Sequence, residues 1–380
     1  MSDKKVLVSV KNLVKHFPIR AGVFKRVVAW VRAVDDISFD IYEGETLGLV
    51  GESGCGKTTA GMTILRLYEP TSGRIIVGEE DTTYYFLPRY KAAKYLKNTY
   101  VKKFETEDPE TFTGVDKKYY EMYKKLGKDG FLKEMLDNIK EKRSEFRKTM
   151  QIVFQDPYSS LNPRLRVKTI VSEGPVLHGT IKKSNVIDKV KEALEEVGIH
   201  GGHMYRFPHE FSGGQRQRIG IARALLMNPK LIVADEAVAA LDVSIRSQVI
   251  NLMLDLQKKH NLTYLFISHD LSVIKYISDR VIVMYLGKIA EMAPKNILFE
   301  EPLHPYTKAL MSAIPVPNPE YKKKRIILQG DVPSPVNPPK GCRFHPRCPV
   351  AKEICSKQEP QLKELNPGHY VACHFPGTLK

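Results

Sequence analysis

The residues with the clearest chemistry form one glycine-rich stretch: Gly51, Glu52, Ser53, Gly54, Cys55, Gly56, Lys57, Thr58 and Thr59. Glycines let backbone N–H groups approach a phosphate chain closely, and the N-terminus of a following helix favours negative charge. A lysine at this spacing reaches the β- and γ-phosphates of a nucleotide, and the next threonine ligates Mg²⁺. The stretch therefore predicts a nucleotide site with Lys57 and Thr58 as its reactive side chains.

The segments on either side of this stretch are the ones needed to position it. Residues 46–50 are apolar enough for a short buried strand, and residues 60–65 begin a helical pattern. A strand, a glycine-rich turn and a helix N-terminus together direct the N–H groups at one point. The sequence thus predicts a phosphate-binding loop rather than a simple connecting turn.

A second acidic element follows an apolar run much later in the chain. Residues 231–234 are Leu-Ile-Val-Ala, and Asp235 and Glu236 come directly after them. In a parallel sheet such a strand delivers its carboxylates to the edge where ligands bind. We expect Asp235 to hold Mg²⁺ and Glu236 to orient the attacking water as a base.

A second phosphate-binding turn precedes another helix, predicted over residues 216–227. It consists of Phe211, Ser212, Gly213, Gly214 and Gln215. Ser212 can cap the helix, and the paired glycines allow an anion to approach the backbone. Two such turns in one chain make sense if two subunits hold nucleotide between them, each giving its loop and receiving the other's turn. Together the three elements closely resemble the signature of ABC-type ATPases.

This resemblance implies ATP and Mg²⁺ as ligands and assigns further residues. Gln155 matches the glutamine that couples Mg²⁺ and the attacking water to the transport partner, and His269 matches the histidine that contacts the γ-phosphate. Asp242 matches the loop that faces the opposite cassette. Phe17 stands where the family stacks an aromatic ring on adenine, although a core phenylalanine at a strand end is an alternative.

Short strands that alternate with helices indicate an α/β fold with a largely parallel sheet. The resemblance implies a P-loop NTPase ABC cassette, with a RecA-like core, an antiparallel β subdomain and a helical subdomain. We expect this cassette at residues 1–286, with its helical signature subdomain at about 156–227. Residues 81–149 are predicted as a mostly helical insertion, either a solvated decoration or a surface for a partner. Residues 287–380 form a C-terminal region, with a proline-rich linker at 315–339 and a small cysteine-rich extension at 342–373.

Three longer strings resemble the ATPases of dipeptide and oligopeptide importers. They are Asp-Pro-Tyr-Ser-Ser-Leu-Asn-Pro-Arg at 156–164, Pro-His-Glu-Phe-Ser-Gly-Gly-Gln at 208–215, and His-Pro-Tyr-Thr-Lys-Ala-Leu at 304–310. The first string and the extended loop at 18–32 resemble the F-type subunit. The resemblance implies a second, D-type ATPase or a second copy of the chain, two transmembrane permease subunits and an extracytoplasmic solute-binding protein. It places the chain at the cytoplasmic face of the cell membrane.

Two features depart from those importers. Ala237 stands where many relatives have proline, and the insertion at 81–149 is longer than usual. Neither feature touches a predicted catalytic position, but the insertion puts a standard partner interface in doubt. The transported solute, peptide or oligosaccharide, does not follow from this chain.

The four cysteines of the tail, Cys342, Cys348, Cys355 and Cys373, are separated by five, six and 17 residues. Structural zinc usually shows closer pairs, whereas four thiolates without a short pair suit an iron–sulfur cluster. The resemblance implies a [4Fe–4S] cluster. Zinc and free thiols remain alternatives.

Composition and charge limit the partners, locations and functions that the chain can have. The net charge of +16 fits either a lysine-coated surface or a peripheral membrane location. We expect no nucleic acid as a partner, because no nucleic-acid motif accompanies the charge. The chain has no apolar run of about 18 residues and no secretory signal, so we expect no membrane span. A non-transport ABC ATPase acting on DNA or ribosomes, and a pure scaffold, are the rival functions.

Overall fold

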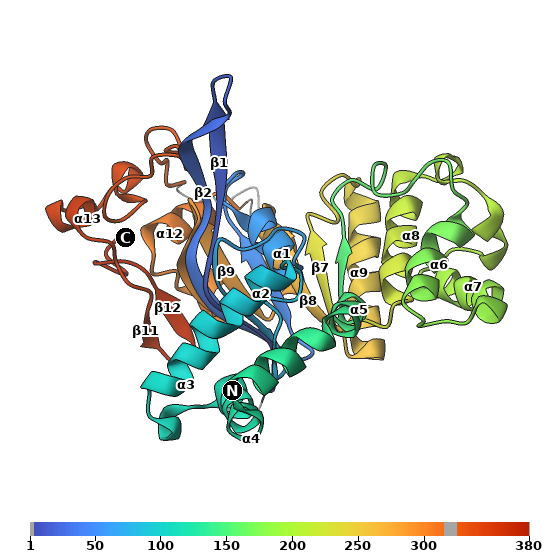
Figure 1. The fold of residues 1–380 in the computed structure, drawn as a ribbon. Helices are drawn as coiled ribbons and strands as arrows, with labels where there is room; N and C mark the ends of the chain where they lie inside the picture. Colours follow the sequence, from blue (N-terminus) through green and yellow to red (C-terminus); the bar gives the residue numbers. More distant parts are fainter. Residues whose placement is uncertain (1–3, 315–324, 380) are drawn as a thin grey trace.

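Two sheets organise the fold, as seen in a computed structural model that describes residues 4–314 and 325–379. The smaller sheet is antiparallel. Its strands, in spatial order, are β2 (Arg26–Tyr42), β1 (Val6–Ala21), β4 (Ser72–Val77) and β5 (Glu80–Asp81). Figure 1 shows β1 and β2 as a long hairpin that rises above the rest of the molecule.

The larger sheet has eight strands and is parallel from β6 to β9. Its order is β11 (Lys363–Asn366), β12 (His369–Val371), β10 (Lys288–Pro294), β9 (Arg280–Tyr285), β3 (Thr46–Val50), β8 (Thr263–Ser268), β7 (Leu231–Asp235) and β6 (Met150–Val153). The central strands β3, β7 and β8 are buried along their whole length. Because both faces of these strands are buried, their sequences are largely apolar and do not alternate between polar and apolar residues.

Each face of the larger sheet has its own core. Leu231 and Val233 of β7 pack with α1 and the smaller sheet, whereas Ile232 and Ala234 pack with the helices of the other face. This split follows from the alternation of side chains along a strand. The cassette helices are α1 (Lys57–Ile64), α6 (Val167–Leu177), α7 (Val186–Glu196), α8 (Gly213–Leu225), α9 (Val243–His260) and α10 (Leu271–Ile277). Helices α6, α7 and α8 form a lobe at the right of Figure 1.

Residues 81–149 fold into helices that pack on the smaller sheet. They are α2 (Arg89–Leu96), the π-helical turn η1 (Lys97–Val101), α3 (Lys102–Thr106), the short η2 (Pro109–Thr111), α4 (Gly114–Asp137) and α5 (Ile139–Thr149). Helix α4 is interrupted at Gly127, whose φ is 70°. Its apolar face, including Phe131 and Met135, is buried. None of the described helices is long and apolar enough to cross a bilayer.

A buried polar network attaches the insertion to β4 and β5. The Asp81 carboxylate is inaccessible to solvent and accepts hydrogen bonds from Tyr95 and Tyr100, each 2.7 Å long. Arg74 lies 3.6 Å from Asp81 and 2.8 Å from Asp116 of α4. Because a buried carboxylate must be paired, these contacts fix the insertion firmly to the sheet.

The C-terminal region corrects one prediction. The small cysteine-rich extension was expected beside the cassette, but β12 pairs with β10 and β11 pairs with β12, so this tail continues the main sheet. The strands have four and three residues, too short to show a pattern in the sequence. The other elements here are α11 (Lys295–Glu300), α12 (Pro305–Ser312), η6 (His345–Arg347) and α13 (Glu353–Lys357). Part of the predicted linker, 315–324, lies outside the described residues.

The remaining short turns belong to the helical lobe: η3 (Lys183–Asn185), η4 (Gly201–Tyr205) and η5 (Pro208–Glu210).

Buried polar side chains fasten the tail to the cassette. The Glu291 carboxylate of β10 accepts N–H groups from Leu303 and His304, and lies 2.7 Å from His369 of β12. His304 caps α12 by accepting the N–H of Tyr306. Burial lowers the pKa of His304 to about 4, so this imidazole is neutral in the folded chain.

The buried His304 predicts a loss of stability in mild acid. Its folded pKa lies below the unfolded value of 6.5, so between the two the unfolded chain binds more protons. Lowering the pH from 7 to 5 should therefore reduce the free energy of unfolding by about 2 kcal/mol through this group alone. Thermal unfolding of the wild type and of His304→Asn, which keeps a capping acceptor, measures the difference. An equal acid-induced loss in both proteins would contradict the assignment to His304.

Candidate nucleotide-binding site

The predicted phosphate loop joins β3 to α1, and two of its glycines, Gly51 and Gly56, leave no room for side chains. A methyl group on Gly51 would lie 2.2 Å from the Met284 carbonyl oxygen, and one on Gly56 would lie 2.0 Å from that of Ala33. Gly56 also has a φ of 106°. The loop backbone is therefore pressed against β9 and β2, while Ser53 and Gly54 at its tip are exposed. This shape fits a cradle for a phosphate chain.

Lys57 is buried beneath the loop. Its ammonium donates to the carbonyl oxygens of Gly51 at 2.8 Å and of Glu52 at 3.0 Å. Both acceptors are neutral carbonyl groups, so these hydrogen bonds leave the positive charge of Lys57 without a directly bonded anion. Such a cation favours an anion that approaches the same loop.

Thr58 and Asp235 provide the oxygen ligands that Mg²⁺ prefers. The Thr58 hydroxyl donates to the Asp235 carboxylate at 2.8 Å, although the two residues are 177 positions apart. Burial raises the pKa of Asp235, and the Thr58 hydrogen bond opposes that rise. The oxygen atoms of Thr58 and Asp235 therefore fit Mg²⁺. Thr59 follows in the first turn of α1, where its carbonyl accepts the Thr63 hydroxyl.

Three polar side chains from the ends of parallel strands meet beside this pair. The Glu236 carboxylate follows β7, accepts Gln155 Nε2 at 3.0 Å and lies 3.1 Å from His269 Nδ1. Gln155 follows β6 and His269 follows β8. The backbone of Glu236 has a φ of 45°, and its N–H donates to the Ile267 carbonyl. A non-glycine residue in this region is strained, which is common at functional sites.

The predicted second phosphate turn begins α8, in the helical lobe. The Ser212 hydroxyl accepts the N–H of Gln215, and the Gln215 side chain accepts the N–H of Ser212. This capping box leaves the turn ordered and Ser212 exposed. A methyl group on Gly214 would lie 2.4 Å from Ile245 of α9, which is too close. A methyl group on Gly213 would lie 3.5 Å from the Tyr158 hydroxyl oxygen, an ordinary van der Waals contact. Figure 1 shows α8 in the lobe with α6 and α7, whereas α1 lies beside the strands of the two sheets. The two turns of one chain therefore do not form one site.

Known proteins share both the motifs and the C-terminal region. A family model described as ABC transporter matches residues 34–239. The chain belongs to the ABC transporter family. A second model, for the C-terminal region of oligopeptide/dipeptide transporters, matches residues 290–355. This ABC cassette therefore carries the C-terminal region of that branch.

Two curated relatives match over nearly their full length. The oligopeptide transport ATP-binding protein AppF of Bacillus subtilis is 48% identical, covering 98% of both chains. YkfD of the same organism, a putative oligopeptide transport ATP-binding protein, is 46% identical over 97% of this chain and 95% of that protein. The predicted resemblance to peptide-importer ATPases is confirmed.

Solved structures show the same fold. The cassette MJ0796, in a dimeric post-hydrolysis state bound to ADP and Pi, aligns with a TM-score of 0.54 and 22% identity, over 76% of this chain and 98% of that one. cbiO1 from Clostridium perfringens aligns with a TM-score of 0.53 and 22% identity, over 78% and 91%. The predicted P-loop NTPase cassette fold is therefore confirmed.

Phe17 lies on β1 of the ABC cassette with its ring half-buried. The ring packs edge-on against Tyr68 at 5.4 Å between centroids, and the Lys15 ammonium lies 4.6 Å from its centroid. Tyr68 was not expected at this place; it follows α1 and is 42% exposed. Asp242 is exposed at the start of α9.

The sequence did not indicate that the C-terminal region contacts the phosphate loop. Arg347 of η6 forms two hydrogen bonds to the Glu52 carboxylate, 2.8 and 3.1 Å long. The Tyr306 hydroxyl of α12 accepts the N–H of Glu52 at 2.9 Å. These partners are separated by 295 and 254 residues, so no local pattern could have linked them. Cys55, within the loop, is buried, and burial raises the pKa of its thiol.

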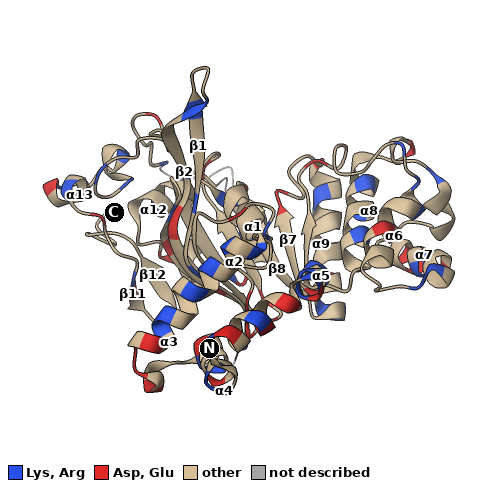
Figure 2. Cartoon of the chain, viewed as in Figure 1, with Lys and Arg blue, Asp and Glu red and all other residues tan. Residues whose placement is uncertain are grey.

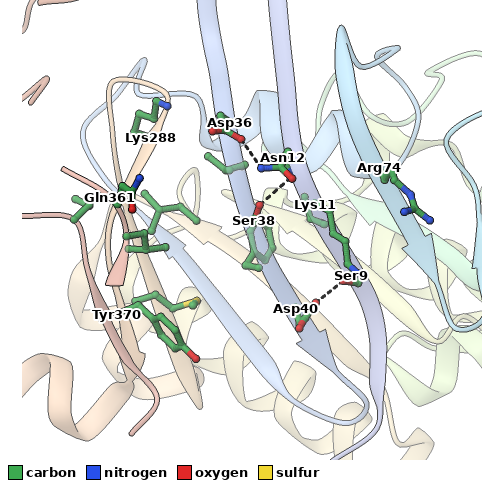
Figure 3. A pocket seen from close by; sticks show the side chains of 18 of the residues that line it. Ser9, Lys11, Asn12, Asp36, Ser38, Asp40, Arg74, Lys288, Gln361 and Tyr370 are labelled. Carbon is green, nitrogen blue, oxygen red and sulfur yellow. Dashed lines mark hydrogen bonds between the residues drawn. The ribbon is translucent and has the colours of Figure 1, made fainter. Parts of the chain in front are cut away.

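The cavity shown in Figure 3 is separate from the nucleotide site. It measures about 1110 Å³ and lies among β1, β2, β10 and the tail. None of the described residues that line it belongs to the phosphate loop or to the group formed by Gln155, Glu236 and His269. Its polar side chains largely bind one another: Ser9 donates to Asp40 at 2.5 Å, and Asn12 to Asp36 at 2.9 Å. Few groups are left to recognise a ligand.

The predicted iron–sulfur cluster is wrong, and so is its zinc alternative. Within 4–314 and 325–379, no group of three or more His, Cys, Asp or Glu is arranged to hold a metal ion. The four tail cysteines are free and line one small cavity. Burial raises the pKa of Cys342 and of Cys373 to about 11, so both thiols are protonated in the folded chain as described. Their spacing alone was misleading because it carries no information on burial.

The Arg347–Glu52 contact predicts that the tail supports nucleotide binding. Arg347→Met keeps the apolar stem but removes both hydrogen bonds and leaves the loop carboxylate unpaired. We expect the dissociation constant for a fluorescent ATP analogue to rise about 3- to 10-fold, in line with the loss of one bidentate pair. The control is Lys357→Met, which breaks only an exposed pair with Glu353. Unchanged affinity in a folded Arg347→Met protein would refute the coupling.

Proposed function

We propose that this chain is the ATP-hydrolysing subunit that drives import of di- and oligopeptides through an ABC transporter. The observation that carries the proposal is the convergence of Gln155, Glu236 and His269 beside the Thr58–Asp235 pair. Near full-length similarity to an oligopeptide transport ATP-binding protein supports the solute class. The same similarity disfavours the alternative of an ABC ATPase that acts on nucleic acid or ribosomes.

The phosphate loop positions ATP. Backbone N–H groups from Gly51 to Thr59 and the Lys57 ammonium bind the β- and γ-phosphates, and Phe17 stacks on adenine. Thr58, Asp235 and Gln155 would hold Mg²⁺, which would neutralise charge on the phosphates. The residues act by fixed dipoles and charges more than by covalent chemistry.

Glu236 orients the attacking water and accepts its proton. Gln155 donates a hydrogen bond to Glu236, which fixes the carboxylate beside the Mg²⁺ ligands. His269 is 57% exposed at the open side of the site, where it can contact the γ-phosphate. The strained backbone of Glu236 holds the carboxylate in this direction.

Two cassettes complete each nucleotide site. The turn Ser212–Gln215 lies in the helical lobe, away from the phosphate loop of its own chain, and its serine is exposed. We propose that it closes over the loop of a second cassette, with Asp242 at the same interface. The second cassette is a related D-type ATPase, or a second copy of this chain.

The remaining partners are two membrane permeases and an extracytoplasmic solute-binding protein. Segment 155–164 begins at Gln155, whose side chain contacts Glu236, and contains the exposed Tyr158, so it can transmit closure of the cassettes to the permeases. In this proposal the chain lies at the cytoplasmic face of the membrane. Oligosaccharides are the alternative solute; uptake of labelled peptide into vesicles containing the assembled transporter distinguishes the two.

The role of Glu236 predicts that a variant without the base binds ATP but hardly hydrolyses it. Glu236→Gln keeps the size of the side chain but removes the base, so ATP should bind and bring two cassettes together while phosphate release slows at least about 100-fold. Gel filtration with ATP and a phosphate-release assay measure the two effects. Glu300→Gln, an exposed position on α11, is the matched control. Wild-type turnover in Glu236→Gln would remove Glu236 from the role of base.

A further inference from the structure

The tip of the β1–β2 hairpin stands outside the body of the molecule. Strand β4 pairs with β1 only from Val8 to Val14, whereas the pairing of β1 with β2 continues to Ala21 and Arg26. The turn is closed by a hydrogen bond from the Lys25 N–H to the Gly22 carbonyl, 3.0 Å long. Figure 1 shows this end rising beyond every other strand.

Large apolar side chains are exposed on this tip. The exposed fractions are 94% for Val23, 84% for Phe24, 61% for Val28, 47% for Trp30 and 46% for Val27. Val27 and Val28 are adjacent in a strand, so they point to opposite faces of the hairpin. An apolar tip that is convex and exposed on both faces suits immersion in a fluid layer better than contact with one flat protein surface.

The same tip is uniformly basic. Residues 18–34 contain Arg20, Lys25, Arg26 and Arg32 and no acidic residue. Figure 2 shows blue and no red on the projecting end. Among the described residues, Arg20, Lys25 and Arg26 form no ion pair; the Arg26 guanidinium lies 5.9 Å from the Phe24 ring. These charges complement anionic headgroups, and tryptophan favours the boundary between water and lipid.

We infer that the tip of the β1–β2 hairpin, residues 18–32, inserts into the headgroup layer of an anionic membrane. Phe24, Val23 and Trp30 enter the apolar boundary, while Arg20, Lys25 and Arg26 bind lipid phosphates. The segment that follows β6, proposed to face the permeases, runs along the same upper side of Figure 1. The hairpin would thus hold the cassette against the bilayer beside the permeases.

The inference goes beyond the proposed function, and it can be tested without permease or ATP. Trp30 is the only tryptophan of the chain, so its fluorescence reports on the tip alone. Full-length protein is mixed with phosphatidylcholine vesicles, with or without phosphatidylglycerol. We expect a blue shift, and quenching by brominated lipid, only with the anionic vesicles, both reversed by high salt.

Variants distinguish the contribution of the tip to membrane binding from that of the general positive charge of the protein. Val23→Asp with Phe24→Asp, and Arg20→Gln with Lys25→Gln and Arg26→Gln, should each reduce co-sedimentation with anionic vesicles at least about tenfold. The controls are Tyr90→Asp with Leu177→Asp, at apolar positions that are 72% and 78% exposed, and Lys91→Gln with Lys94→Gln and Lys97→Gln, which remove the same charge. Retained nucleotide binding shows that each variant is folded.

Three results would overturn the inference. The first is the absence of a Trp30 shift with any vesicle. The second is an equal loss of binding in the tip variants and their controls, which would show that general charge alone attracts the protein. The third is a Trp30 shift that needs a second cassette or the permeases, which would assign the tip to a protein contact.

Discussion

The structure depends on placing one buried ammonium, that of Lys57, under a glycine-rich loop. The Lys57 ammonium is held by the carbonyl dipoles of Gly51 and Glu52 and by the Cys55 sulfur, and the cost of burying its charge is best offset by an incoming phosphate chain. The loop can take this shape because Gly51 and Gly56 lie against backbone carbonyls of β9 and β2. Both sheets are therefore needed to form the site.

The sequence was sufficient for the parts of the site that follow parallel strands. Gln155, Asp235, Glu236 and His269 each come directly after an apolar run, and the carboxyl ends of such strands meet at one edge. Their mutual contacts follow from that topology. The contact of Arg347 with Glu52 could not be predicted, because it depends on how a distant tail packs.

The insertion and the tail show where composition misleads. The sequence left the insertion open as a solvated decoration or a partner surface, yet its Tyr100 and Tyr119 are fully buried and Tyr100 donates to the inaccessible Asp81. Helical periodicity predicted the helices but not which polar side chains would turn inward. Likewise, the cysteine spacing suggested metal ligands, whereas the described residues contain no group of His, Cys, Asp or Glu that is arranged to hold a metal ion.

The direct bond between η6 and the phosphate loop has a thermodynamic corollary. If the docked tail favours the loop shape that binds nucleotide, then nucleotide must favour the docked tail by the same free energy. Cys348 follows Arg347 immediately, so its half-buried thiol would react more slowly with an alkylating reagent when ATP is bound. The reactivity of Cys348 would thus report whether nucleotide is bound, at a position far along the chain from Glu236, the proposed base.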